Sequence, residues 1–150
     1  MALHRYWMWA NRLRDYFDSA LVSPSWLERL KNFTDSNPFA FGIAFFADEP
    51  GMFMSHWYGA LYVVIEGWQE LELQDPEINK LLEHSNVGLL RRYRNGSFHY
   101  QKDYFDDRFE GFMAEKDSVE WVRTLNKAFG RYFLDYISKN KAEQGAAANP

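Results

Sequence analysis

The residues that could do chemistry are concentrated in one short stretch, R-Y-R-N-G-S-F-H-Y at positions 92–100. His99 carries an imidazole, a group that gives or takes a proton near neutral pH. Arg94 carries a guanidinium, which stays charged and binds phosphate oxygens. Asn95 could orient the ring or bind a phosphate oxygen. One fixed cation and one acid/base are enough for metal-free cleavage of RNA, because the ribose 2′-hydroxyl supplies the nucleophile.

The spacing within this stretch sets a geometric condition. Arg91, Asn95 and His99 are four residues apart and would lie along one stripe of a continuous helix. Arg94 precedes His99 by five residues, which is roughly 140° around an ideal helix. The two side chains therefore converge only if the helix bends near Gly96 or if a second copy of the chain completes the site. The alternative is an ordinary helix end, where the helix dipole favours a histidine.

Other kinds of site find little support in the sequence. The four histidines form no pair at three or four residues, and no phosphate-binding loop or nucleophile elbow is present. The absence of cysteine excludes disulfides and thiolate chemistry. Asp103, Asp106 and Asp107 are interpreted as a solvated loop or helix start rather than a metal site. We therefore expect no metal and no cofactor.

The composition indicates one folded domain. Apolar residues make up 47% of the chain and aromatic residues 19%, so some aromatic surface is expected to line a groove or a subunit interface. The net charge of −4 excludes a uniformly basic nucleic-acid coat but allows a local basic patch. The longest apolar run, 39–46, is too short to span a membrane and is interpreted as a buried connection or short helix. Without a signal-peptide pattern, a cytoplasmic location is expected.

Helical periodicity dominates the chain, beginning with the apolar positions from Leu3 to Leu21. Further helix starts are predicted at Ser25 with Glu28, at Asp75-Pro76 and at Asp117 with Glu120. A third helix is predicted to follow Pro50-Gly51. The helix from Asp75-Pro76 is expected to bend at 86–88, and the last helix carries an apolar stripe from Val119 to Phe133. The prediction is an all-α bundle of four to five main helices over residues 1–140, with a disordered tail at 141–150.

The segment R94-N95-G96-S97-F98-H99, set among helices, resembles the signature of the HEPN superfamily: Arg, a polar residue that is often Asn, three residues, then His. The resemblance implies a HEPN-like helical bundle that acts as a metal-independent endoribonuclease in a toxin, defence or RNA-processing context. It also implies a homodimer whose two copies build one composite site. By this resemblance Arg94 stabilises the phosphate, Asn95 positions it and His99 transfers the proton. Arg91, Arg92 and Lys102 would hold RNA.

The resemblance leaves alternatives open. HEPN toxins work with an antitoxin, and in one branch a partner nucleotidyltransferase modifies the tyrosine of His-x-Tyr. Here Tyr100 follows His99 directly, which departs from that pattern. The acidic segment 66–83 would repel RNA if it lay near the cleft. The second hypothesis is a non-catalytic HEPN-like module for dimerisation or for binding a nucleotide, RNA or protein. A third is a helical bundle unrelated to HEPN.

Overall fold

The computed structural model describes residues 1–33, 37–104 and 106–147, with side chains described up to residue 139. Within these ranges the chain forms eight helices and no strand. The helices are α1 (Leu3–Leu21), α2 (Pro24–Asn32), α3 (Pro38–Phe46), α4 (Glu49–Glu70), α5 (Pro76–Leu82), α6 (Asn86–Phe98), α7 (Asp107–Met113) and α8 (Ser118–Ala147). The predicted all-α bundle is confirmed, with α1, α4, α6 and α8 as its long helices and four short helices connecting them.

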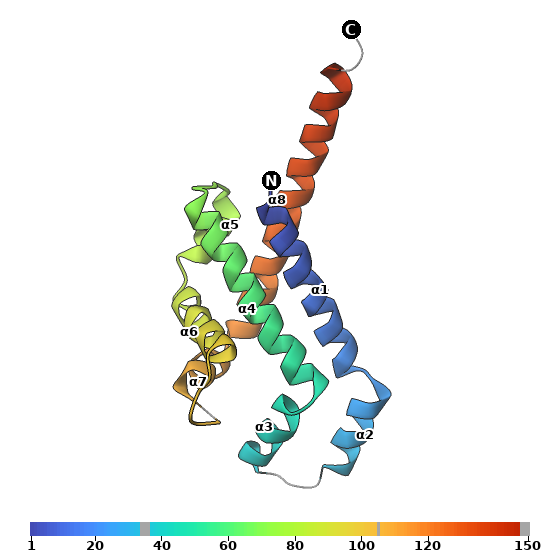
Figure 1. The fold of residues 1–150 in the computed structure, drawn as a ribbon, viewed down its shortest axis with the longest axis vertical. Coiled ribbons are helices and arrows are strands. Elements are labelled where there is room, and N and C mark those ends of the chain that lie inside the picture. Colours follow the sequence, from blue (N-terminus) through green and yellow to red (C-terminus); the bar gives the residue numbers. More distant parts are fainter. Residues whose placement is uncertain (34–36, 105, 148–150) are drawn as a thin grey trace.

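The central helix is α4, which lies between α1 and α6 (Figure 1). Its side chains are buried around most of the circumference, as expected for a helix that is apolar on several sides. Tyr58 meets Tyr93 of α6 with ring centroids 5.4 Å apart, and Trp68 meets Phe129 of α8 at 5.5 Å. These edge-to-face aromatic contacts hold α6 and α8 against α4.

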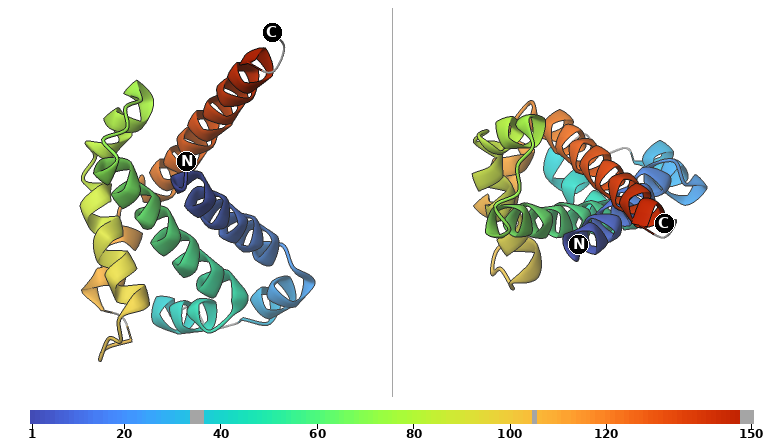
Figure 2. Two further views of the ribbon diagram at one scale, coloured as in Figure 1. Left: turned by 45° about the horizontal axis from the view of Figure 1, so that its top comes forward. Right: turned by 90° about the horizontal axis from the view of Figure 1, so that it is seen from above.

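The first and last helices are also joined directly. The indole Nε1 of Trp7 donates to the backbone carbonyl of Asn126 at 3.1 Å. Farther along α1, Asp18 and Arg123 form an ion pair at 2.6 Å. Beyond these contacts, the C-terminal end of α8 projects past the other helices (Figure 2).

Local signals explain several helix starts. Asp75 accepts hydrogen bonds from the backbone N–H groups of Glu77 and Ile78, both at 3.1 Å, so the predicted cap and the following Pro76 are confirmed. The predicted cap at Ser25 is wrong. Ser23 is the N-cap of α2, because Pro24 fits the first helical position. The cap therefore lies two residues before Ser25.

The start of α4 also differs from the prediction. Asp48 is its N-cap and accepts a hydrogen bond from the N–H of Glu49 at 2.8 Å. Pro50 and Gly51 therefore lie inside the first turn instead of preceding the helix. Proline is tolerated there because the first-turn N–H groups have no partner within the helix.

The apolar run 39–46 forms the short helix α3, one of the two predicted forms, and is not a buried connection. No residue of α3 is buried, and Phe39, Phe41 and Ile43 are exposed. The helix packs on the rest of the protein through Phe45, whose ring lies 5.8 Å from that of Trp26, and Phe46, whose ring lies 6.4 Å from that of Phe109. A nine-residue helix at the edge of the bundle has neighbours on too few sides to cover all its apolar side chains.

The break between α5 and α6 falls at residues 83–85, before the predicted bend at 86–88. Nδ1 of His84 accepts the backbone N–H of Asn86 at 3.2 Å, which supports the start of α6. The carboxylate of Asp117 lies 3.2 Å from Nε2 of His84 and accepts the Asn86 side-chain amide at 3.0 Å. Asp117 directly precedes α8, as predicted. Its side chain binds His84 and Asn86 and so stabilises the α5–α6 junction.

The long helix α8 carries most of its expected stripe: Val122, Leu125, Phe129 and Phe133 are buried, whereas Val119 in the first turn is exposed. The helix continues to Ala147, so residues 141–147 extend it where a disordered tail was expected. Alanine, lysine, glutamate and glutamine in this segment are strong helix formers. Residues 148–150 lie outside the described residues. No helix in the described part of the chain combines the length and the hydropathy needed to cross a bilayer.

Candidate functional site

The helix α6 presents the predicted residues on the outside of the bundle. Its inward face is formed by Leu90, Tyr93 and Gly96, which are buried. Helical geometry places Arg91 and Asn95 on the opposite side, and Arg91 and Arg92 are exposed. Packing of the inward face therefore leaves the motif accessible to a ligand.

Arg94 is held at the border between α6 and α4. Its Nη1 donates to Oδ1 of Asn95 at 3.0 Å, and its Nη2 lies 3.7 Å from Oε2 of Glu66. Glu66 begins the acidic segment that was expected to repel RNA if it lay near the site. The structure places its carboxylate against the arginine on which phosphate binding would depend.

His99 lies just past the end of α6. Its backbone is extended, with φ −125° and ψ 135°, and its N–H donates to the carbonyl of Asn95 at 3.2 Å. The side-chain amide of Gln101 donates to the His99 carbonyl at 2.5 Å. The side chain of His99 is exposed. The change from helical to extended backbone at this residue means that the ideal-helix angle between Arg94 and His99 does not apply.

Within one chain, Asn95 makes hydrogen bonds with Arg94 and with the backbone of His99. The side chains of Arg94, Asn95 and His99 do not, however, line one cavity together. His99 lines a cavity of about 460 Å³ with Asn95, Tyr100, Gln101 and Arg108, and Arg94 is outside its lining. The guanidinium that shares a cavity with His99 is therefore that of Arg108. Nothing in its sequence spacing indicates this, because the chain turns between α6 and α7.

The other predicted RNA contacts are cations near the same helix end. Lys102 is exposed in the segment after His99. Burial raises the pKa of the Tyr62 hydroxyl, as does Glu66, while the positive charges of Arg91 and Arg94 lower it. The charges of Arg91, Arg94 and Glu66 thus act together on the Tyr62 hydroxyl between α4 and α6.

An exposed aromatic ring and a second histidine adjoin the motif. The ring of Phe98 is 51% exposed and lies against Gly59, where any Cβ would collide with it. His56 meets this ring edge-on at 5.8 Å. Nδ1 of His56 donates to the carbonyl of Met52 at 2.8 Å, so its exposed Nε2 is the basic nitrogen of the neutral ring. Nothing in the sequence connects His56 with the motif, because it lies on α4, far from the motif in the chain.

The aspartates after the motif have structural positions. Asp106 is the N-cap of α7 and accepts the backbone N–H of Arg108 at 2.9 Å. Asp107 lies in the first turn of the same helix, and Asp103 is exposed. Within the described ranges, no three histidine, aspartate or glutamate side chains gather as a metal-binding group.

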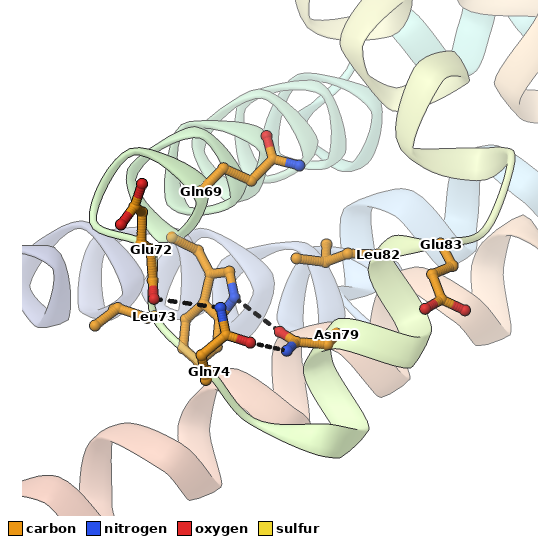
Figure 3. A pocket seen from close by; sticks show the side chains of 8 residues that line it. Gln69, Glu72, Leu73, Gln74, Asn79, Leu82 and Glu83 are labelled. Carbon is orange, nitrogen blue, oxygen red and sulfur yellow. Dashed lines mark hydrogen bonds between the residues drawn. The ribbon is translucent and has the colours of Figure 1, made fainter.

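A separate cavity of about 600 Å³ lies between the end of α4 and α5. Figure 3 shows that its amide side chains bond to one another: Trp68 donates to Asn79 at 3.2 Å, Asn79 to Gln74 at 2.6 Å, and Gln74 to the carbonyl of Glu72 at 3.3 Å. The backbone of Glu72 has the left-handed φ of 50°. The α4–α5 end of the bundle, where this cavity lies, is far from α7 (Figure 1). Its amides hydrogen-bond to one another and to the backbone, and so stabilise the α4–α5 turn.

Comparison of the chain with protein-family models, with curated proteins and with solved structures finds no match. The likeness to the HEPN superfamily therefore depends on residues 94–99 and on their all-helical setting.

Proposed function

We propose that this chain is a metal-independent endoribonuclease of HEPN type. The observation that supports the proposal best is the position of Asn95. Its side-chain oxygen accepts a hydrogen bond from the Arg94 guanidinium at 3.0 Å, so two of the three motif side chains are in contact at the accessible end of α6. The backbone carbonyl of Asn95 accepts the backbone N–H of His99, which keeps the third residue at the same helix end.

The proposed chemistry is transesterification within RNA. The 2′-oxygen attacks the adjacent phosphorus, the bond to the 5′-oxygen breaks, and the products are a 2′,3′-cyclic phosphate and a 5′-hydroxyl. An imidazole takes the proton of the 2′-hydroxyl, and another acid protonates the leaving oxygen. A guanidinium stabilises the charge that builds on the phosphate oxygens.

The convergence of Arg94 and His99 in one site is assigned to a second copy of the chain. Arg94 and His99 of one chain do not line the same cavity, so the proposed active site pairs Arg94 of one protomer with His99 of its partner. A two-fold dimer would contain this arrangement twice. The substrate class is single-stranded or loop RNA, whose backbone can enter such a site.

The direct test incubates the purified protein with a mixed RNA pool in EDTA and analyses the ends of the products. We expect cleavage with cyclic-phosphate ends by the wild type. Arg94→Ala and His99→Ala should each reduce the rate by about 10²-fold or more. Arg29→Ala is the matched control, because Arg29, like Arg94, is an arginine in an ion pair, with Asp48 at 2.9 Å. Equal cleavage by wild type and both motif variants would overturn the proposal.

One observation favours a second candidate, the non-catalytic HEPN-like module that binds RNA, a nucleotide or a protein. Glu66 and Asn95 already occupy the guanidinium of Arg94, as in a structural ion pair. In this case the protein would bind its ligand without cleaving RNA, and His99→Ala would leave binding unchanged. Absence of cleavage together with retained binding therefore selects the module.

A further inference from the structure

The outer face of α1 carries an arginine–aromatic repeat that has no part in the site described above. Arg5 is followed four residues later by Trp9, and Arg12 is followed four residues later by Tyr16. The two pairs are seven positions apart, which is close to two helical turns. All four side chains therefore lie within about 60° of the helix circumference. We call these four residues the α1 ladder.

Within each pair, the arginine lies over the ring. Cζ of Arg5 is 5.4 Å from the Trp9 ring centroid, and Cζ of Arg12 is 5.7 Å from that of Tyr16. Both rings are partly open to solvent: Trp9 is 54% exposed, and Tyr16 is 47% exposed, with its ring centroid 5.4 Å from that of Phe53 in α4. The ladder thus presents charge and aromatic surface in alternation.

The ladder arginines also lack carboxylate partners. Neither Arg5 nor Arg12 forms an ion pair with any described residue, whereas Arg14, on the neighbouring face of α1, pairs with both Asp15 and Asp18. Arg5 and Arg12 are both exposed. They leave a local positive potential that an external anion can satisfy.

We propose that the α1 ladder binds single-stranded nucleic acid, with bases stacked on Trp9 and Tyr16 and phosphates held by Arg5 and Arg12. Alternation of rings and cations matches the alternation of bases and phosphates in a strand, and stacking on aromatic side chains tolerates any base. The two rings are about 10 Å apart along the helix, so the strand between them passes Arg12. That the strand is RNA rests on the proposed function.

The same face does not have the character of a membrane-binding helix. An interfacial helix buries a continuous apolar stripe between lipid chains, with its cations on the other side. Here Arg5 and Arg12 lie within the aromatic stripe itself and would be carried toward the hydrocarbon. The ladder also lies on the far side of α4 from α6, so it is separate from the motif and can be altered independently (Figures 1 and 2).

The test measures fluorescence anisotropy of a labelled, unstructured RNA 20-mer with His99→Ala protein, so that cleavage does not interfere. Trp9→Ala with Tyr16→Ala should raise Kd at least tenfold. Arg5→Gln with Arg12→Gln should lower the slope of log Kd against log salt by about 1.4, as expected for two lost phosphate contacts to a single strand. Leu134→Ala and Arg29→Gln, both at exposed positions, are the matched controls, and circular dichroism checks the helix content of each variant.

The outcomes separate this inference from the proposed function. Binding that depends on the ladder, in a protein that cleaves no RNA, supports the inference and removes the enzyme. Cleavage by wild type with unchanged Kd in all ladder variants overturns the inference and leaves the enzyme. Equal affinity for duplex RNA overturns it too, because stacked bases in a duplex cannot reach the rings. Ladder-dependent flotation with phosphatidylserine vesicles, without RNA binding, would also overturn it and assign the face to a membrane.

Discussion

Arg94 of α6 and Glu66 of α4 form an ion pair across the two helices, with Nη2 and Oε2 3.7 Å apart. Glu66 is half-exposed, with 44% of its side chain accessible, so the pair is only partly shielded from solvent. A phosphate that binds Arg94 must compete with this carboxylate. The pair therefore acts against the function proposed for the motif, and its strength can be measured.

Glu66→Gln is expected to increase the affinity of His99→Ala protein for single-stranded RNA by about 1.4- to fivefold, since exposed ion pairs contribute about 0.2–1 kcal/mol. The gain should be largest at low salt, where the competing charge is least screened. Glu70→Gln is the control, because it makes the same change of net charge one turn farther along α4. An equal gain from both substitutions would show that only overall charge matters and that Arg94 is not the phosphate contact.

Mixing two inactive variants tests the composite site. If Arg94 of one protomer works with His99 of its partner, a heterodimer of Arg94→Ala and His99→Ala contains one intact site and one doubly altered site. Random exchange of protomers should therefore restore about one quarter of wild-type activity. The measurement is the initial cleavage rate after co-expression or refolding of the mixture. No recovery, despite heterodimers detected by mass spectrometry, would place both residues of each site in the same chain.

Asp18 gives the protein a specific sensitivity to acid. Burial alone would raise the pKa of Asp18, but hydrogen bonds and charges from Arg123 and Arg14 lower it below its usual value. A carboxylate whose pKa is depressed by folding stabilises the native state above its unfolded pKa of about 3.9, and this stabilisation is lost as the pH falls through the lower folded pKa.

We therefore expect Asp18→Asn to lower the free energy of unfolding by about 1 kcal/mol at pH 7, allowing for solvent screening of this partly exposed group. The difference from wild type should shrink as the pH falls below about 3.9 and vanish below the lowered folded-state pKa of Asp18. Urea titrations at pH 7, 4 and 3 measure both effects. Asp135→Asn, at an exposed position of α8, is the control that makes the same change of charge.

Two glycines should respond to alanine in opposite directions. A Cβ on Gly51 would collide with the backbone carbonyl of Phe45 and lie 2.6 Å from Cα of Phe46, so α3 would have to move away from α4. We expect Gly51→Ala to reduce the free energy of unfolding by about 2–3 kcal/mol. Gly88 of α6 has open space around its Cβ position, and Gly88→Ala should stabilise by up to about 1 kcal/mol through helix propensity. Denaturant midpoints compare them; a loss at both positions would contradict the open surroundings of Gly88.

The sequence predicted the parts of this fold that depend on local patterns. Asp75 followed by proline carries its cap within a few residues, and the apolar spacing around Leu90 and Tyr93 identifies the inward face of α6. The exposure of α3 could not be predicted, because a run of apolar letters does not say how many neighbours the fold supplies. The capping-box spacing of Ser25 and Glu28 predicts a helix start two residues too late, because Pro24 at the first helical position makes Ser23 the cap.

The site shows the same division. The apolar spacing of α6 predicts which face packs inward, but the sequence leaves open whether Arg94, Asn95 and His99 lie along a continuous helix or at its end. The contact with Glu66 depends on how α4 and α6 are aligned, and the approach of Arg108 to the His99 cavity depends on how the chain turns after the motif. Neither alignment is encoded in local spacing, so the acidic competitor and the second guanidinium emerge only in three dimensions.

The contacts between α1 and α8 have a consequence for synthesis of the chain. Asp18 and Arg123 are 105 residues apart. At the usual 5–20 residues per second, a ribosome needs about 5–20 s to make that stretch. In this interval α1 is synthesised before α8, whose Asn126 carbonyl accepts the hydrogen bond of the Trp7 indole. The nascent chain must therefore keep α1 from aggregating, either by early docking on α4 or with the help of a chaperone.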